Sequence, residues 1–472
     1  MTRSSEAHSS ATGPSGTGPS RYLCDLALID GPDGTTRVEA DVVLTIEDGR
    51  FTAVETGPAP APIPAGTRHL RGLTIPGLAN AHSHAFHRAL RSRTQADRGS
   101  FWTWRDLMYR AAERLDPDGY HRLARATFAE MAMAGVTSLG EFHYVHHAPD
   151  GSRYDDPNAM GSALLAAAAE AGIRITLLDT LYLHGGLTAD GHTPAEGTQR
   201  RYDDGSVEAW ARRVDALTPG EGQRIGAAIH SVRAVDPSAM AAIGRWAAER
   251  DAPLHAHVSE QRAENQQCLD HHGRTPVGLL ADAGVLGDRF SAVHATHLTD
   301  DDVALLGSTG STVCLCPTTE RDLGDGIGPT PELMAAGVAL SLGSDSHAVI
   351  DLFEEARATE LDERLRSEQR GIHSATELLA MAGRNGHRSL GWDDAGTIAV
   401  GGRADLVTVS LASVRTAGTT RATAAEAAVF AATAADVTDV VVDGRAVVTD
   451  GHHTTIDVAA ELSASIGRIL DA

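Results

Sequence analysis

Lysine is absent from this 472-residue sequence, so all 40 of its basic residues are arginine. Mechanisms that form a Schiff base on a lysine amine are therefore excluded. A carbamylated lysine that bridges two metal ions is excluded as well, because that ligand is made from a lysine side chain. If the protein binds a pair of metal ions, a carboxylate has to bridge them.

Cysteines and long apolar runs are also scarce. The four cysteines are too few and too scattered for a disulfide framework, and Cys314 and Cys316 are expected as buried thiols on one face of a strand. No run of about 18 apolar residues occurs, which argues against a membrane-spanning helix. Residues 1–20 are rich in Ser, Gly, Thr and Pro and lack the apolar segment of a signal peptide. We therefore expect a disordered tail at residues 1–20 and a cytoplasmic protein.

Positive charge is scarce relative to negative charge. The sequence has 63 acidic residues against 40 basic ones, which gives a formal net charge of −23. Nucleic acids and anionic membranes are bound through local positive potential. We therefore expect neither nucleic acid nor a membrane as a partner.

Eight short apolar runs alternate with longer segments that have helical patterns. One helix is expected over Pro237–Arg250, with Asp236 as its N-terminal cap. Eight strands that alternate with helices favour an α/β fold of the (β/α)₈ TIM-barrel type. An open α/β sheet is the alternative, because periodicity alone does not reveal closure. The expected strands are Leu73–Ala79, Val136–Phe142, Ile173–Tyr182, Ile225–Ile229, Leu254–Val258, Ser291–Val293, Thr312–Leu315 and Val338–Leu342.

The two flanks of this region have short alternating segments broken by Gly and Pro, which is typical of antiparallel strands. We expect residues 21–72 and 396–455 to form one small β-sandwich domain built from both chain ends. The barrel would then occupy residues 73–395, and residues 456–472 would form a C-terminal helix. The expected flanking strands are Val42–Ile46, Phe51–Val54, Ala404–Val409, Val437–Val442 and Ala446–Thr449.

Histidines and acidic residues follow several of the expected barrel strands. His82 and His84 are spaced i, i+2 at the end of the first strand, so both imidazoles project to the same side. A barrel presents the carboxyl ends of its strands at one face, where the active site lies. His, Asp and Glu are also the ligands and bases that divalent metals and hydrolytic chemistry use. Later strand ends carry His257 with Glu260, then His294, then Asp345.

This pattern closely resembles the amidohydrolase superfamily over residues 40 to 450. The resemblance implies that His82, His84, His257 and Asp345 bind metal. Since no lysine is available as a bridge, we expect one divalent ion rather than two. Zinc is the default for three histidines and an aspartate, with iron and manganese as alternatives.

The mononuclear deaminases of that superfamily have a Glu and a His at the positions of Glu260 and His294. A bound divalent ion lowers the pKa of water from 15.7 to about 7. The resemblance then implies that Asp345 accepts the proton of the attacking water and that Glu260 relays a proton to the departing nitrogen. His294 would stabilise the charge that develops at the attacked carbon.

Four further segments resemble the N-formimidoyl-L-glutamate deiminases, which release ammonia from formimidoylglutamate in histidine degradation. From these segments the resemblance implies substrate contacts by Arg105, Tyr144, His230 and Arg233. The sequence departs from the resemblance at His87, where those enzymes have a glutamine, so His87 is expected as a substrate contact of different chemistry. The segments are residues 101–109, 141–147, 230–235 and 323–327.

A small-molecule dicarboxylate is therefore the expected substrate, because guanidinium groups bind carboxylates in a bidentate way. The first alternative is a related deaminase that acts on a purine, pyrimidine or triazine ring. The second is a structural relative without catalytic activity, although such proteins typically lose the metal ligands that this chain keeps. The resemblance also implies a homodimer.

Overall fold

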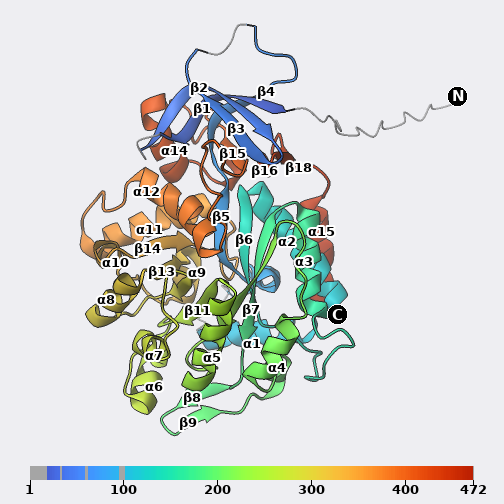
Figure 1. The fold of residues 1–472 in the computed structure, drawn as a ribbon, viewed down its shortest axis with the longest axis vertical. Helices are drawn as coiled ribbons and strands as arrows, with labels where there is room; N and C mark the ends of the chain where they lie inside the picture. Colours follow the sequence, from blue (N-terminus) through green and yellow to red (C-terminus); the bar gives the residue numbers. More distant parts are fainter. Residues whose placement is uncertain (1–18, 32–34, 59–61, 95–100, 471–472) are drawn as a thin grey trace, which may run out of the picture.

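Two large sheets organise the chain (Figure 1). The computed structural model describes residues 19–31, 35–58, 62–94 and 101–470. Residues 1–18, and with them nearly all of the expected N-terminal tail, lie outside the described residues. Within those ranges, no helix combines the length and the apolar character needed to cross a membrane.

Eight parallel strands form the barrel, in the order in which they follow one another along the chain. All of them lie at or within three residues of the predicted runs except the first, which begins later. The sequence therefore locates this sheet well, because its strands are buried on both faces and appear as continuous apolar runs. The strands are β5 (Leu78–Ser83), β6 (Val136–His143), β7 (Arg174–Leu181), β10 (Gln223–Ile229), β11 (Leu254–Val258), β12 (Phe290–His294), β13 (Thr312–Leu315) and β14 (Ala339–Leu342).

The barrel closes between its last strand and its first. A parallel bridge joins Ser83 to Asp345. The amide of Asp345 donates to the carbonyl oxygen of His82 at 3.0 Å, and the amide of His84 donates to that of Asp345 at 3.4 Å. A Cβ atom on Gly343 would lie 2.7 Å from the Cβ of His82, so only glycine allows this approach. The barrel prediction is therefore confirmed, and the open sheet is not.

Helices surround the barrel strands (Figure 1). The predicted helix after Asp236 is α5, and the Asp236 carboxylate accepts hydrogen bonds from Ser238 and Ala239 as its cap. The helices are α1 (Phe101–Glu113), α2 (Pro117–Met133), α3 (Ala159–Ala171), α4 (Val207–Val214), α5 (Pro237–Glu249), α6 (Arg262–His272), α7 (Pro276–Asp282), α8 (Asp300–Thr309), α9 (Pro317–Leu323), α10 (Thr330–Ala335), α11 (Leu352–Ser367), α12 (Ala375–Ala380), α13 (Gly386–Ser389), α14 (Ala424–Phe430) and α15 (Val458–Leu470), with the short turns η1 (Ala85–Leu90), η2 (Gly197–Arg201), η3 (Met381–Asn385), η4 (Arg421–Thr423) and η5 (Ala434–Asp436).

The second sheet is built from both chain ends, as predicted, and lies at one end of the molecule (Figure 1). Phe51 pairs with Gly401 and Gly402 across the sheet and shares a buried cluster with Val441, so the sheet folds over its own core. The β1–β4 pair is parallel, whereas the prediction had only antiparallel strands. In sheet order the strands are β18 (His452–His453), β17 (Arg445–Thr449), β16 (Val437–Val442), β15 (Leu406–Val409), β4 (Arg68–Pro76), β1 (Ser20–Asp30), β2 (Thr36–Glu47) and β3 (Arg50–Glu55), and a separate hairpin pairs β8 (Gly186–Thr188) with β9 (Gly191–Thr193).

Two local predictions need correction. The expected strand Leu73–Ala79 is divided at Gly77, since β4 ends at Pro76 in the small sheet and β5 begins at Leu78 in the barrel. A Cβ atom on Gly77 would lie 2.3 Å from Thr137 Oγ1, so glycine is required where the chain passes between the sheets. Cys316 is buried as expected, but it follows β13 and caps helix α9 instead of lying in the strand.

A buried ion pair joins the small sheet to the barrel. Arg174 at the start of β7 pairs with Asp405, which comes just before β15, and both side chains are almost fully buried. Arg174 Nη1 donates to Asp405 Oδ1 at 3.0 Å. Asp405 also accepts the amide of Asp443 at 3.0 Å. The carboxylate therefore satisfies donors from both parts of the molecule.

We expect Asp405→Ala to lower the free energy of unfolding by about 3–5 kcal/mol, because Arg174 is left as a buried charge without its main partner. The shift of the denaturation midpoint, followed by tryptophan fluorescence, measures this. Asp282→Ala is the matched control, since the Arg274–Asp282 pair is more than half exposed and should contribute about 0–1 kcal/mol. Equal shifts for the two variants would contradict the structural role of Asp405.

Candidate active site

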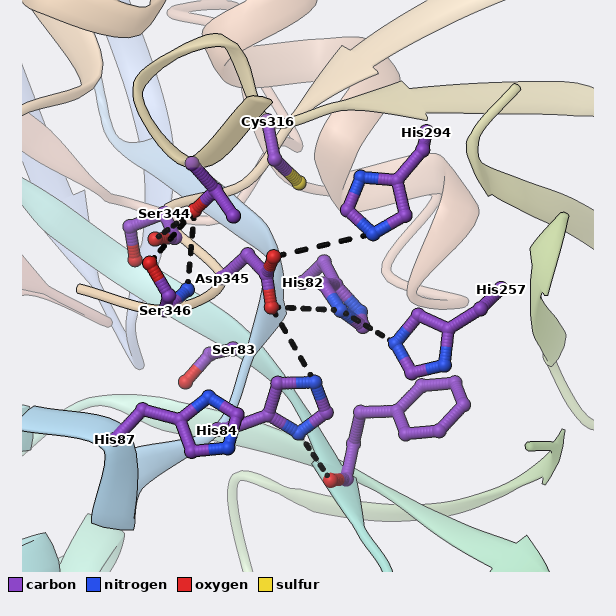
Figure 2. A network of polar contacts seen from close by, with 12 residues as sticks. His82, Ser83, His84, His87, His257, His294, Cys316, Ser344, Asp345 and Ser346 are labelled. Carbon is purple, nitrogen blue, oxygen red and sulfur yellow. Dashed lines mark hydrogen bonds and ion pairs between the residues drawn. The ribbon is translucent and has the colours of Figure 1, made fainter. Parts of the chain in front are cut away.

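Three histidines and one aspartate meet at the carboxyl ends of the barrel strands. His82 lies on β5, His84 directly follows it, His257 lies on β11, and Asp345 follows β14. Asp345 Oδ1 is 3.4 Å from His82 Nε2 and 3.3 Å from His84 Nε2. His257 Nε2 is 3.2 Å from His82 Nε2. Figure 2 shows these rings turned toward the Asp345 carboxylate.

Hydrogen bonds at the back of two rings fix which nitrogen faces the group. The Nδ1 atoms of His84 and His257 are each 2.9 Å from a backbone carbonyl oxygen, those of Phe142 and His230. Because a carbonyl only accepts, each Nδ1 carries the proton and each Nε2 has its lone pair free for a metal ion. Three imidazole nitrogens and a carboxylate are a suitable ligand set for a divalent ion such as zinc.

Burial also prepares these groups for metal. Burial lowers the pKa of His82, and it lowers those of His84 and His257 well below the ordinary value, so the three rings are neutral. Burial alone would raise the pKa of Asp345, but His82 and His294 hold it well below its usual value. Neutral imidazoles and an ionised carboxylate are the protonation states that metal ligation requires.

Strained backbone marks the same strand ends. Ser259, His294 and Asp345 have positive φ angles of 52°, 68° and 40°. Such angles are uncommon outside glycine and persist where the surroundings enforce them. Asn80 Oδ1 accepts the amide of Ser344 at 2.9 Å, and Thr319 Oγ1 accepts the amide of Ser346 at 3.1 Å. The turn that carries Asp345 is therefore held from both sides.

His294 and Glu260 complete the group that the sequence predicted. His294 Nε2 lies 3.9 Å from Asp345 Oδ2. Burial opposes protonation of His294, but Glu260, Glu320 and Asp345 raise its pKa well above the ordinary value. Burial raises the pKa of Glu260, which the charges of His294 and Arg233 partly offset. Both residues line the same pocket as Asp345.

Glu320 is a site residue that the sequence did not reveal. Its Oε1 lies 3.4 Å from His294 Nδ1 and accepts the amide of Cys316 at 2.9 Å. A carboxylate at the back of an imidazole fixes the orientation of the ring. Glu320 lies in helix α9 rather than at a strand end, so it had no ligand spacing to identify it.

All five predicted substrate residues line one pocket. Arg233 Nε donates to Glu264 at 3.2 Å, and Glu264 is fully buried. His87 Nε2 is 3.1 Å from the Tyr144 hydroxyl, and burial lowers the pKa of His87 to about 3, so its ring is neutral. The substrate residues are His87, Arg105, Tyr144, His230 and Arg233.

A second buried group has metal-like spacing but is already satisfied. His143 and His146 lie near Asp179. Both oxygens of Asp179 accept hydrogen bonds of 2.8 Å from the Arg213 guanidinium, and Trp210 donates to one of them at 2.9 Å. The Arg213 guanidinium therefore neutralises Asp179 in the way that a bound metal ion would.

Comparisons with known proteins match most of the chain. The family model described as the amidohydrolase family matches residues 73–447. The chain is 37% identical to a formimidoylglutamate deiminase from Pseudomonas aeruginosa over 86% of its own length and 91% of that protein. It is 30% identical to an 8-oxoguanine deaminase from the same organism, over 79% of its length and 83% of the relative. A crystal structure of an amidohydrolase from Brucella melitensis superposes with a TM-score of 0.86 at 31% identity, covering 96% of this chain and all of the other.

Proposed function

Because this chain belongs to the amidohydrolase family, we propose that it hydrolyses the C=N bond of N-formimidoyl-L-glutamate. Water is consumed, and ammonia and N-formyl-L-glutamate are released. The observation that carries the proposal is the pocket itself, in which Arg105 and Arg233 line the same cavity as Asp345 and Glu260. The 37% identity to the Pseudomonas aeruginosa deiminase supports the same substrate.

One divalent ion, with zinc as the default, would be held by His82, His84, His257 and Asp345. When bound, such an ion supplies Lewis acidity that brings the pKa of water from 15.7 to about 7. The side chains around it then move protons. Asp345 Oδ2, which faces His294, accepts a proton from the attacking water. Glu260 delivers a proton to the nitrogen that departs as ammonia.

His294 stabilises charge at the carbon that is attacked. Glu320 holds the back of its ring, so Nε2 faces Asp345 and the pocket. A donor that is already oriented costs no reorganisation when charge develops, which makes it effective in a site shielded from water. The position of His294 therefore fits electrostatic stabilisation rather than metal ligation alone.

Arg105 and Arg233 provide the positive charge that a protein with a negative net charge needs in order to bind a dianionic substrate. A formal charge of −23 repels dicarboxylates in general, so binding needs local positive groups. Arginine offers a planar fork of donors that matches a carboxylate. Glu264 accepts a hydrogen bond from Nε of Arg233, and Arg233 lines the pocket.

The alternative is a deaminase of a purine or another nitrogen-containing ring. The 30% identity to an 8-oxoguanine deaminase is the observation that favours it. A ring substrate is bound by stacking and by amide-type hydrogen bonds. Two guanidinium groups in one pocket favour carboxylates instead. Ammonia release from a panel of substrates separates the two readings.

We expect kcat/KM for N-formimidoyl-L-glutamate to exceed that for 8-oxoguanine, guanine and cytosine by at least about 10⁴-fold, because these bases have no carboxylate to bind the guanidinium groups of the pocket. Ammonia release is measured with protein loaded with zinc, iron or manganese in parallel. Greater turnover of any of the three bases than of formimidoylglutamate would overturn the proposal in favour of the ring deaminase.

A further inference from the structure

Tyrosine is concentrated in the candidate active site. The chain has only seven tyrosines, and four of them line the pocket. A tyrosine combines an apolar ring with one hydroxyl that can donate a hydrogen bond. Tyr144 is among the predicted substrate residues, whereas Tyr109, Tyr182 and Tyr202 are not. The predicted substrate contacts therefore do not explain the hydroxyls of these three additional tyrosines.

Tyr202 has a buried hydroxyl that lacks a hydrogen-bond partner among the described residues. It directly follows η2, and its side chain is only 1% exposed. Leaving a buried hydroxyl unpaired costs about 1–3 kcal/mol. Because Tyr202 lines the pocket, a ligand in the pocket is the partner that would recover this cost.

The Tyr182 hydroxyl accepts one hydrogen bond and can still donate another. Gln199 Nε2 donates to the Tyr182 hydroxyl at 2.8 Å and to the carbonyl oxygen of Gly185 at 2.9 Å. The phenolic proton of Tyr182 can therefore be donated to something else. Burial raises the pKa of Tyr182, so the hydroxyl stays protonated.

Two series of rings lead from the metal ligands to these tyrosines. Ring centres are 5.2 Å apart from His84 to Tyr144 and 5.0 Å apart from Tyr144 to Tyr202. In the second series they are 5.3 Å apart from His257 to His230 and 4.6 Å apart from His230 to Tyr182. Tyr182 and Tyr202 are thus one ring removed from the candidate metal centre, with ring centres 5.4 Å apart.

Positive charge reaches the same part of the pocket. Burial raises the pKa of Tyr182, and the charges of Arg233 and Arg105 oppose this rise. Both arginines also line the same pocket as Tyr182. An ionised carboxylate accepts about four hydrogen bonds. Two neutral hydroxyls beside the guanidinium groups would complete such a set without adding charge.

We propose that the hydroxyls of Tyr182 and Tyr202 bind the side-chain carboxylate of the substrate and so select dicarboxylates over monocarboxylates. The inference rests on the proposed function for the identity of the substrate. In formimidoylglutamate the reacting carbon is attached to the α-nitrogen, so the side-chain carboxylate is the group farthest from the reaction. Tyr182 and Tyr202 are likewise farther from the metal ligands than Tyr144 and His230, which lie between them in the two series of rings.

The test compares two substrates in Tyr202→Phe and Tyr182→Phe. N-Formimidoyl-L-norvaline has a methyl group in place of the side-chain carboxylate and is otherwise similar in length. We expect kcat/KM for formimidoylglutamate to fall about 10- to 100-fold in each variant, since a hydrogen bond to a charged group is worth about 1.5–3 kcal/mol. Turnover of the norvaline compound should be unchanged. Tyr22→Phe, in the small sheet, is the matched control.

Equal losses on both substrates would indicate a structural role and overturn the inference, as would full activity of both variants. Calorimetric binding of glutarate and butyrate to the metal-loaded protein tests the tyrosines without turnover. We expect glutarate to bind more weakly in both variants and butyrate to bind equally well. If the unaltered protein releases no ammonia from formimidoylglutamate, the proposed function fails, while the glutarate-to-butyrate ratio still decides the role of the tyrosines.

Discussion

Asp345→Asn should yield a folded protein that binds a divalent ion poorly and releases almost no ammonia. Asparagine matches aspartate in shape and tolerates the positive φ of 40° at this position. The backbone bridge to Ser83 can therefore remain. What disappears is the negative charge whose Oδ1 lies 3.4 Å and 3.3 Å from His82 and His84.

The expected loss has two parts. Metal affinity should fall by more than about 100-fold, since changes even to groups behind the ligands cost 10- to 100-fold. Turnover should fall by about 10⁴-fold or more, because the acceptor of the water proton is removed together with the ligand. Metal content after dialysis and ammonia release at saturating substrate measure the two parts.

Asp393→Asn serves as the control, since Asp393 pairs with Arg289 at the surface and its side chain is 54% exposed. It should retain both metal and activity. A variant at Asp345 with normal metal content and normal turnover would remove this residue from the proposed centre. Loss of metal in both variants would instead indicate that the preparation is at fault.

Glu260→Gln should have a different effect, with full metal content and a turnover about 10³-fold lower. General acid–base groups contribute about 10²- to 10⁴-fold to a rate. Glutamine keeps the size of the side chain and its capacity to hydrogen-bond, but it cannot carry a proton to the departing nitrogen. Since Glu260 is not one of the four expected metal ligands, the ion should still bind.

The two measurements together test the division of roles. Metal analysis and kcat are determined for Glu260→Gln beside Glu249→Gln, whose side chain is 73% exposed and which should behave like the unaltered protein. Loss of metal in Glu260→Gln would make Glu260 a ligand. Activity within about tenfold of normal would exclude it as the proton carrier.

The sequence predicts the barrel and the centre at its strand ends because both have strong local signals. Seven of the eight expected runs coincide with barrel strands, since strands buried on both faces are apolar throughout. The His82–His84 spacing and the acidic or histidine residues after later strands indicate one shared face. The structure brings His82, His84, His257, His294 and Asp345 together at that face.

What the sequence does not predict depends on contacts between distant segments. The run Leu73–Ala79 is continuous in hydrophobicity, so its division between two sheets at Gly77 leaves no trace in the pattern. Glu320 reaches His294 from a helix. In the sequence, Tyr182 and Tyr202 cannot be told from core residues. In the structure, both lie in the connection after β7 and line the pocket. Single residues without periodicity carry no information on partners far along the chain.

The seam between β5 and β14 has a consequence for the order in which the molecule can be completed. Strand β5 leaves the ribosome early, but its neighbour β14 follows only after residue 338. The backbone hydrogen bond from Asp345 to His82 therefore joins residues that are far apart in the sequence, and contacts of this kind slow folding. A nascent chain that already contains His82, His84 and His257 still has an open barrel edge and an incomplete ligand set. Closure of the barrel, and with it completion of the proposed ligand set, is therefore expected late in synthesis.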